Sequence, residues 1–204
     1  TFTTEHACCE SRVTNIHRFA DLMQGVYLNP GESVSLNGHV GERTEEKGFV
    51  PGGFISRGHL VTDIGGGVSQ YATTIFNAAF YAGLDFETYQ SHSLYISRYP
   101  RGREATISHP APDLEIVNTT DYPILIGNTY TDTSITVNMY STPNVEVLET
   151  GQVESTWGEV CTHVETFRQR TYEDGTEVDD SVFAIYRPDE GISCDGSRIP
   201  EPED

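Results

Sequence analysis

Three consecutive glycines lie directly before a segment with helical periodicity, and they constrain the fold more than any other feature of the chain. After Gly65-Gly66-Gly67, apolar residues recur at positions 72, 75, 76, 79 and 80. This spacing predicts a helix over about 69–82 with one buried face, ended by Gly83. Ser69 and Gln70 then belong to the first turn, where unpaired N–H groups and the helix dipole favour negative charge.

Ser69 is the candidate nucleophile that this arrangement suggests. A glycine loop lets a substrate approach the backbone, and a hydroxyl group at a helix N-terminus is a common part of acyl-transfer sites. Gly66, Gly67 and Gln70 would then bind the substrate beside it. The structural alternative is a turn in which Ser69 is an ordinary N-cap residue. A serine-hydrolase elbow is excluded because Tyr71 replaces its second glycine, and a phosphate loop is excluded because no lysine follows the glycines.

The rest of the first 142 residues predicts an α+β domain. A helix is expected over 11–24, where apolar residues at 13, 16, 20 and 23 share one face and Gly25 follows. Residues 37–60 are rich in glycine and charge, and they are expected to form a long functional loop with brief strands. Short strands are expected on both sides of the turn at 29–31 and near 85–99, 113–118, 122–128 and 133–140.

The C-terminal third has a different composition and predicts a separate β-rich extension. Residues 161–172 alternate in polarity, turn at Asp174-Gly175 and return through 176–187, which predicts a β-hairpin. We therefore expect two main helices packed on antiparallel or mixed strands, with a C-terminal β-hairpin appendage. The expected organisation is a domain over 1–142, a β-rich extension over 143–195 and a disordered acidic tail over 196–204.

The charge balance limits the partners. The net charge is −19, and Lys47 is the one lysine. Binding to nucleic acid or to an anionic lipid surface requires a basic face, so neither partner is expected. No apolar stretch reaches membrane-spanning length, so we expect no membrane contact within this segment.

The four cysteines indicate an oxidising compartment. Cys161 and Cys194 flank one β-rich segment, and we expect a disulfide between them. Cys8 and Cys9 are compatible with a vicinal bridge or with free thiols. The chain is accordingly expected to be extracytoplasmic, as a secreted or membrane-anchored ectodomain.

Several blocks of the chain resemble one known family. They occur in the family's order at residues 2–4, 12–16, 28–37, 40–44, 64–80, 91–93, 102–106 and 113–118. Together they resemble the VanW-domain family, whose signature usually reads Gly-Gly-Gly-(Ile/Val)-Cys-Gln followed by Ser/Thr-Thr, an aromatic residue and Asn-Ala. The likeness covers roughly residues 1–140, so residues 1–142 are interpreted as a VanW-like domain. Arg43 and Asn77 match family blocks and are equally compatible with structural roles.

The resemblance implies a role in the cell wall. VanW domains have been linked to peptidoglycan, and the resemblance implies that some members act as L,D-transpeptidases through the cysteine of the signature. This chain has Ser69 at that position. Because a serine hydroxyl needs an adjacent base, whereas cysteine depends least on activation, three explanations stay open. Ser69 is a natural nucleophile, an engineered substitution or the mark of a non-catalytic subfamily.

His92 is the candidate base for Ser69. A neutral imidazole accepts a proton near neutral pH, and His92 lies in a block that resembles the family. The structural alternative is a histidine satisfied by hydrogen bonds at a strand edge. The other histidines, His109 among them, have no ligand spacing, so no metal and no cofactor are expected.

An arginine cluster follows His92 in the sequence. Arg98, Arg101 and Arg103 form the one basic island of an acidic chain, with Tyr95 nearby. Arg103 could pair bidentately with a carboxylate of a stem peptide, and Arg98 and Tyr95 could assist in binding. The structural alternative for Arg103 is an ion pair with Glu104 or another nearby acid.

The leading hypothesis is an extracytoplasmic peptidoglycan acyl transferase, similar to L,D-transpeptidases, with Ser69 as nucleophile and His92 as base. The alternative is a catalytically inactive module that binds stem peptides or another anionic wall ligand. A third hypothesis is a structural or partner-binding ectodomain in which the motif only builds the fold.

Overall fold

The chain folds into an α+β structure, as expected. The computed structural model describes residues 1–7, 11–56 and 59–200. The helices are α1 (Ser11–Met23), α2 (Leu36–Val40) and α3 (Ser69–Tyr81), with a 3₁₀ turn at Glu45–Lys47. The strands are β1 (Phe2–Glu5), β2 (Tyr27–Leu28), β3 (Ser33–Ser35), β4 (Pro51–Ser56), β5 (His59–Ile64), β6 (Asp85–Thr88), β7 (Glu115–Val117), β8 (Ile124–Thr131), β9 (Ser134–Tyr140), β10 (Val145–Trp157), β11 (Cys161–Tyr172) and β12 (Glu177–Tyr186).

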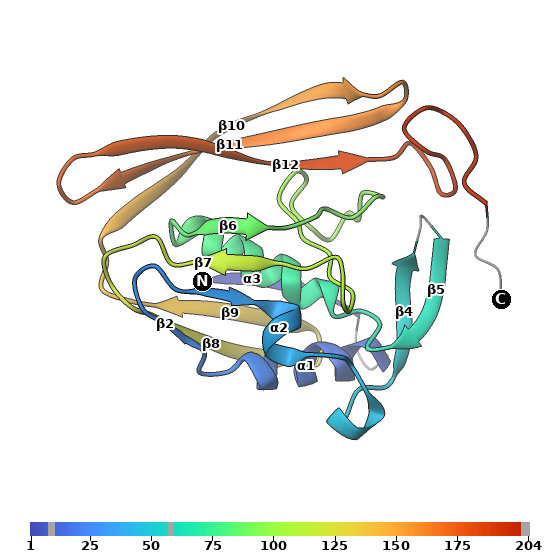
Figure 1. Ribbon diagram of the computed structural model, residues 1–204, viewed down its shortest axis with the longest axis horizontal. Coiled ribbons are helices and arrows are strands. Elements are labelled where there is room, and N and C mark those ends of the chain that lie inside the picture. The colour runs from blue at the N-terminus through green and yellow to red at the C-terminus, as the bar shows by residue number, and fades with distance from the viewer. Residues whose placement is uncertain (8–10, 57–58, 201–204) are drawn as a thin grey trace.

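The core forms around α3, with strands on more than one side of it (Figure 1). An antiparallel sheet in the order β1-β9-β8-β2 packs against α1 and α3. The ring of Phe76 on α3 also stacks on Phe86 of β6, in the smaller sheet β3-β7-β6, with ring centroids 4.2 Å apart. Residues 70–80 are consequently all buried. The predicted helices over 11–24 and 69–82 are confirmed to within one residue at their ends.

Two predicted segments differ from the structure. Within residues 37–60, expected to be a loop with brief strands, the chain forms α2, the 3₁₀ turn, β4 and the start of β5. The strand expected over 85–99 ends at Thr88, and residues 89–112 contain no strand. The physical reason is that backbone groups of residues 103–107 bond to side chains of α3 instead of to a neighbouring strand. The side chains of Tyr89 and Ser91 accept from backbone N–H groups of β12.

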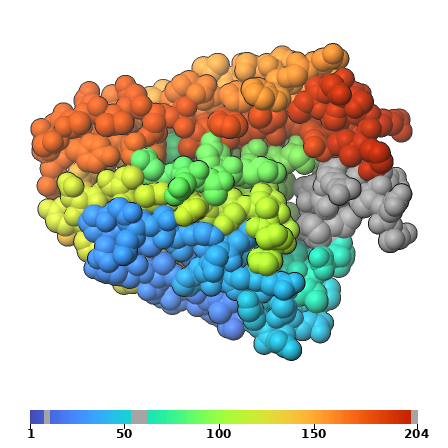
Figure 2. All heavy atoms as spheres, in the orientation of Figure 1, coloured from blue at the N-terminus to red at the C-terminus, as the bar shows by residue number. Residues whose placement is uncertain are grey.

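The C-terminal extension is a three-stranded sheet in the order β10-β11-β12, which contains the predicted hairpin β11–β12. One face of the sheet is buried against the rest of the molecule. Val182 of β12 belongs to the main hydrophobic core. Figure 2 shows these strands as a continuous layer along one side of the molecule. The extension is therefore packed into the fold and not merely attached to it.

Two buried arginines of β11 bind the C-terminal end of α3. Arg168 is 2% exposed and donates to the carbonyl oxygens of Phe80 (2.7 Å) and Leu84 (2.8 Å). Arg170 donates to the carbonyl oxygen of Gly83 at 3.1 Å. The last carbonyl groups of a helix lack partners within the helix and carry partial negative charge, so these guanidinium groups compensate them.

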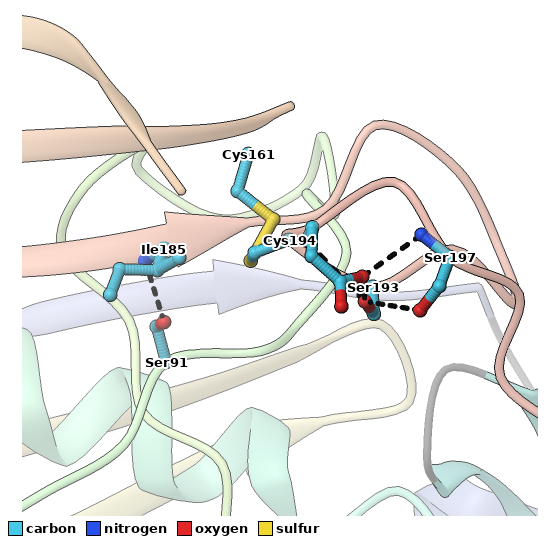
Figure 3. The surroundings of a disulfide bond; sticks show 7 residues. Ser91, Cys161, Ile185, Ser193, Cys194 and Ser197 are labelled. Atoms are coloured by element: carbon cyan, nitrogen blue, oxygen red, sulfur yellow. Dashed lines mark hydrogen bonds between the residues drawn. A yellow bond between two sulfur atoms is a disulfide. The ribbon is translucent and has the colours of Figure 1, made fainter. Parts of the chain in front are cut away.

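The predicted disulfide between Cys161 and Cys194 is confirmed and joins the start of β11 to the segment after β12 (Figure 3). Cys8 and Cys9 lie outside the described residues. Ile199 donates to the carbonyl oxygen of Gly191 at 2.7 Å, and Ile192 and Arg198 form a β-bridge. The first part of the tail expected to be disordered is therefore hydrogen-bonded to the preceding loop.

Removal of this disulfide by a Cys161→Ser/Cys194→Ser double substitution should lower the free energy of unfolding. The bridge closes a loop with a sequence separation of 33 residues. Chain entropy for a loop of that length gives a loss of up to about 3–4 kcal/mol. Urea denaturation of the double variant and the parent under non-reducing conditions measures the difference. Equal midpoints and equal slopes for the two proteins would contradict the expectation.

Candidate functional site

The glycine loop before α3 is in close contact with three neighbours, one for each glycine. A Cβ atom at Gly65 would lie 2.6 Å from Cβ of Arg43, and one at Gly67 would lie 2.7 Å from Cβ of Arg12. A Cβ atom at Gly66 would overlap the backbone carbonyl group of Gly52 in β4. The triple glycine is therefore required by packing within the protein.

Asn15 of α1 holds the glycine loop against the segment that enters β4. Its side-chain amide is fully buried and donates to the carbonyl oxygens of Val50 (2.8 Å) and Gly66 (2.9 Å). Its Oδ1 accepts from the backbone N–H of Val50 at 2.8 Å. This amide satisfies three backbone groups and fixes where α3 begins.

Ser69 is the first residue of α3, which confirms its predicted place in the first turn. The N-cap residue is Val68, whose side chain forms no capping hydrogen bond. The structural alternative in which Ser69 is the N-cap is therefore wrong. The helix N-terminus keeps its capacity to interact with a negative group.

The Ser69 hydroxyl is engaged by the extended segment 103–107. Its Oγ accepts from the backbone N–H of Ile107 (3.2 Å) and lies 3.3 Å from the carbonyl oxygen of Ile107 and 3.1 Å from Oγ1 of Thr106. Thr73 bonds Ala105, and Asn77 donates to the carbonyl oxygen of Arg103.

The α3 residues that bond this segment are four positions apart in the sequence: Ser69, Thr73 and Asn77. Their partners are two positions apart: Ile107, Ala105 and Arg103. Four helical residues rise about 6 Å and two extended residues about 6.6 Å, so the two spacings match. Ser69 thus occupies the first position of a row of side chains that holds this segment along α3.

His92 is paired with Glu104, which sequence reasoning did not recognise as its partner. Nδ1 of His92 lies 2.5 Å from Oε2 of Glu104, and both side chains are buried. The imidazole also stacks on Tyr99, with ring centroids 5.3 Å apart. Burial raises the pKa of the Tyr99 hydroxyl to about 12. The sequence signal for the pair was weak, because the two residues lie in an irregular segment without a common periodicity.

Two arginines of the basic island, Arg101 and Arg103, pair with acids of β10. Arg103 is 3.2 Å from Glu149 and lies over the rings of Phe80 and Tyr81. Arg101 pairs with Glu154 at 2.8 Å.

The other predicted substrate-binding side chains, Tyr95, Arg98 and Gln70, do not line the pocket at the glycine loop. Tyr95 is exposed and lies 5.0 Å from the Arg101 guanidinium. Arg98 is exposed. Gln70 is fully buried and bonds Thr4, Arg12 and the carbonyl oxygen of Glu5.

A pocket of about 280 Å³ lies at the glycine loop and the start of α3. Three predicted site residues line it together: Gly66, Gly67 and Ser69. His92, Gln70, Arg98, Tyr95 and Arg103 are not among its lining residues. Sequence reasoning assigned no site role to Arg43 or His109, which also line it. Arg43 directly follows Gly41-Glu42 in a family-like block, which was the available signal.

Comparison with known proteins decides the family. The family model described as VanW like protein matches residues 11–140. The chain belongs to the VanW-like family. It is 36% identical over 132 residues to the uncharacterized protein YoaR of Bacillus subtilis, an alignment that covers 65% of this chain and 44% of YoaR. It is 25% identical over 146 residues to the vancomycin B-type resistance protein VanW of Enterococcus faecalis, over 68% of this chain and 52% of that protein.

This VanW-like chain spans about half the length of these curated relatives. No solved structure matches it significantly. Within residues 1–7, 11–56 and 59–200, no helix has the length and apolar character needed to cross a membrane. Over the same residues, no group of three or more histidine, cysteine or acidic side chains is arranged to hold a metal ion.

Proposed function

We propose that this VanW-like domain is an extracytoplasmic module of the cell wall that binds peptidoglycan stem peptides non-covalently in the pocket at Ser69. The observation that carries the proposal is the state of Ser69. Its hydroxyl bonds to Thr106 and Ile107, and His92 is not at the pocket. Within the described residues no histidine is hydrogen-bonded to Ser69, although His109 lines the same pocket. A serine that is not bonded to a base is a poor nucleophile but a good hydrogen-bonding group.

Two further features support this function. The pocket combines glycine backbone, hydroxyl groups and a helix N-terminus, which together suit the polar groups of a peptide ligand. The Cys161–Cys194 disulfide favours an oxidising compartment outside the cytoplasm. The VanW resemblance supplies the wall peptide as the ligand class.

Filling the pocket tests the proposal. Ser108 lines it, so Ser108→Phe should abolish binding of purified muropeptides in calorimetric titration. Ser155→Phe, on an exposed position of β10, is the matched control and should bind as the parent does. Ser69→Ala should retain binding within a few-fold. Absence of binding by the parent, or equal binding by Ser108→Phe, would overturn the proposal.

Acyl transfer is the second candidate, and the pair of His92 with Glu104 favours it. A buried carboxylate that orients an imidazole is the usual partner of a nucleophile. In this reaction His92 would have to reach Ser69 from outside the pocket and take the proton as Oγ attacks a peptide carbonyl. The leaving amine would then depart with a proton, and a second amine would accept the acyl group. An acyl adduct on Ser69 after incubation with a stem-peptide donor, detected by mass spectrometry, would establish this function.

Ser69→Cys tests whether the site activates a nucleophile at this position. A helix N-terminus stabilises a thiolate over a thiol, so the pKa of the new thiol should lie below the ordinary value of about 8.5. The pH dependence of iodoacetamide labelling measures it, with the adduct mapped to position 69 by digestion because Cys8 and Cys9 are also present. Ser155→Cys is the exposed control. Identical labelling midpoints at positions 69 and 155 would show that the site provides no activation.

A further inference from the structure

Arg43 is a buried guanidinium with few partners. Its side chain is 8% exposed, and Nη1 donates to the carbonyl oxygen of Gly41 at 3.2 Å. Nε and Nη2 are buried, and no group in the described part of the chain accepts a hydrogen bond from them. The guanidinium also lies 5.1 Å from the ring centre of Phe19. Most of the donors of this cation are therefore unsatisfied, which is costly in a protein interior.

The nearby acid does not neutralise Arg43. No carboxylate within residues 1–7, 11–56 and 59–200 forms an ion pair with it. Asp113 acts on it at longer range, but this carboxylate accepts from the N–H groups of Asn37 and Leu114 and from Ser35 Oγ. Burial lowers the pKa of Arg43 to about 10, against the opposing effect of Asp113. Arg43 still carries a full positive charge at neutral pH.

Arg43, of which Nε and Nη2 lack hydrogen-bond partners among the described residues, is at the pocket that begins α3. Arg43 lines this pocket, and its aliphatic part packs on Gly65 of the glycine loop. The N-cap residue of the helix that begins at the same pocket, Val68, forms no side-chain capping bond. Two exposed acids, Glu42 and Asp63, also line the pocket. The pocket thus has a buried positive group and two accessible negative groups.

We propose that this pocket binds a free α-amino-acid group, whose carboxylate pairs with Arg43 and whose ammonium is held by Glu42 and Asp63. A planar guanidinium matches a carboxylate, and the acids attract an ammonium. The same acids repel a doubly charged phosphate. The volume of about 280 Å³ also suits a small ligand. This inference rests on the proposed binding function and names the ligand group that the pocket selects.

Small molecules that carry one or both of the ligand's charged groups test the contributions of the carboxylate and the ammonium separately. In ¹H–¹⁵N NMR titrations of the whole chain, D-alanine should shift the amide signals of residues 65–69 saturably. Propionate, which lacks the ammonium, and alaninamide, which lacks the carboxylate, should each bind at least ten-fold more weakly. Inorganic phosphate should bind more weakly than D-alanine. A Glu42→Gln/Asp63→Asn double variant should lose affinity for D-alanine and keep its affinity for propionate.

The Arg43→Met variant distinguishes a role of Arg43 in ligand binding from a role in the stability of the fold. Methionine keeps the aliphatic part on Gly65 and removes an unpaired buried charge, so the variant should melt at or above the temperature of the parent without ligand. Its affinity for D-alanine should fall at least ten-fold. Arg198→Met, at an exposed arginine with no predicted role in the site, should bind as the parent does. Arg43→Lys keeps the charge but lacks the two parallel N–H donors of a guanidinium. This variant should bind D-alanine less tightly than the parent does.

The outcomes distinguish this inference from the proposed function. Failure of D-alanine to shift residues 65–69, or tighter binding of phosphate, would overturn the inference even if muropeptides bind. Muropeptide binding that Ser108→Phe abolishes and Arg43→Met leaves intact would keep the proposed function and overturn the role of Arg43. An Arg43→Met variant that fails to fold, with an Arg43→Lys variant that binds D-alanine normally, would assign Arg43 a structural role and overturn the inference.

Discussion

Replacement of Arg168 by alanine should destabilise the protein by about 3–5 kcal/mol, the usual cost of removing one partner from a buried charged network. The Arg168 guanidinium bonds the carbonyl oxygens of Phe80 and Leu84 and pairs with Asp180 at 2.6 Å and Asp85 at 3.3 Å. Without it, the carbonyl oxygens of Phe80 and Leu84 at the end of α3 lose their charged donor inside the fold. Chemical denaturation monitored by circular dichroism measures the loss.

Arg101→Ala is the matched control for this prediction. Arg101 is on the surface and pairs with Glu154, whose side chain is 52% exposed. An exposed pair of this kind contributes less than about 1 kcal/mol. A loss at Arg168 as small as that at Arg101 would mean that the β10-β11-β12 sheet adds little to the stability of the VanW-like domain.

The secondary structure followed from local patterns where those patterns were complete. The period of α1 and α3 and the Asp174-Gly175 turn of the β11–β12 hairpin were sufficient to place these elements. The role of Arg168 and Arg170 could not be predicted. In the sequence they alternate along a strand like solvent-facing residues, and only the position of the end of α3 makes that face internal.

The candidate site was predictable only where it is formed by residues that are adjacent in the sequence. The glycine loop and Ser69 form one local motif, and the structure keeps them together at one pocket. Arg43 reaches that pocket from a distant segment, and Glu104 meets His92 through an irregular segment. Neither contact follows from a repeat or a spacing. The sequence also did not show that the glycines are needed for packing against Arg43, Gly52 and Arg12.

Gly66→Ala should be among the most damaging single-methyl substitutions in the chain. The added Cβ would overlap the backbone carbonyl group of Gly52, and neither group can rotate away, because the backbone fixes the position of both. Overpacking typically costs about 1–3 kcal/mol, and a clash between two backbone segments belongs at the upper end or beyond it. The expected loss of unfolding free energy is therefore about 3 kcal/mol or more, measured by urea denaturation.

Gly25→Ala separates this clash from backbone strain. Gly25 has φ of +81°, and an added Cβ would meet no atom within 4 Å, so its cost is the left-handed conformation alone, about 1–2 kcal/mol. At Gly66 the φ angle is outside the left-handed region, so there the cost is contact alone. In NMR spectra of Gly66→Ala, displaced amide signals should centre on the glycine loop, β4 and Asn15. A Gly66→Ala variant as stable as Gly25→Ala would mean that β4 yields easily, and the glycine loop would then have no fixed wall against which to shape the pocket at Ser69.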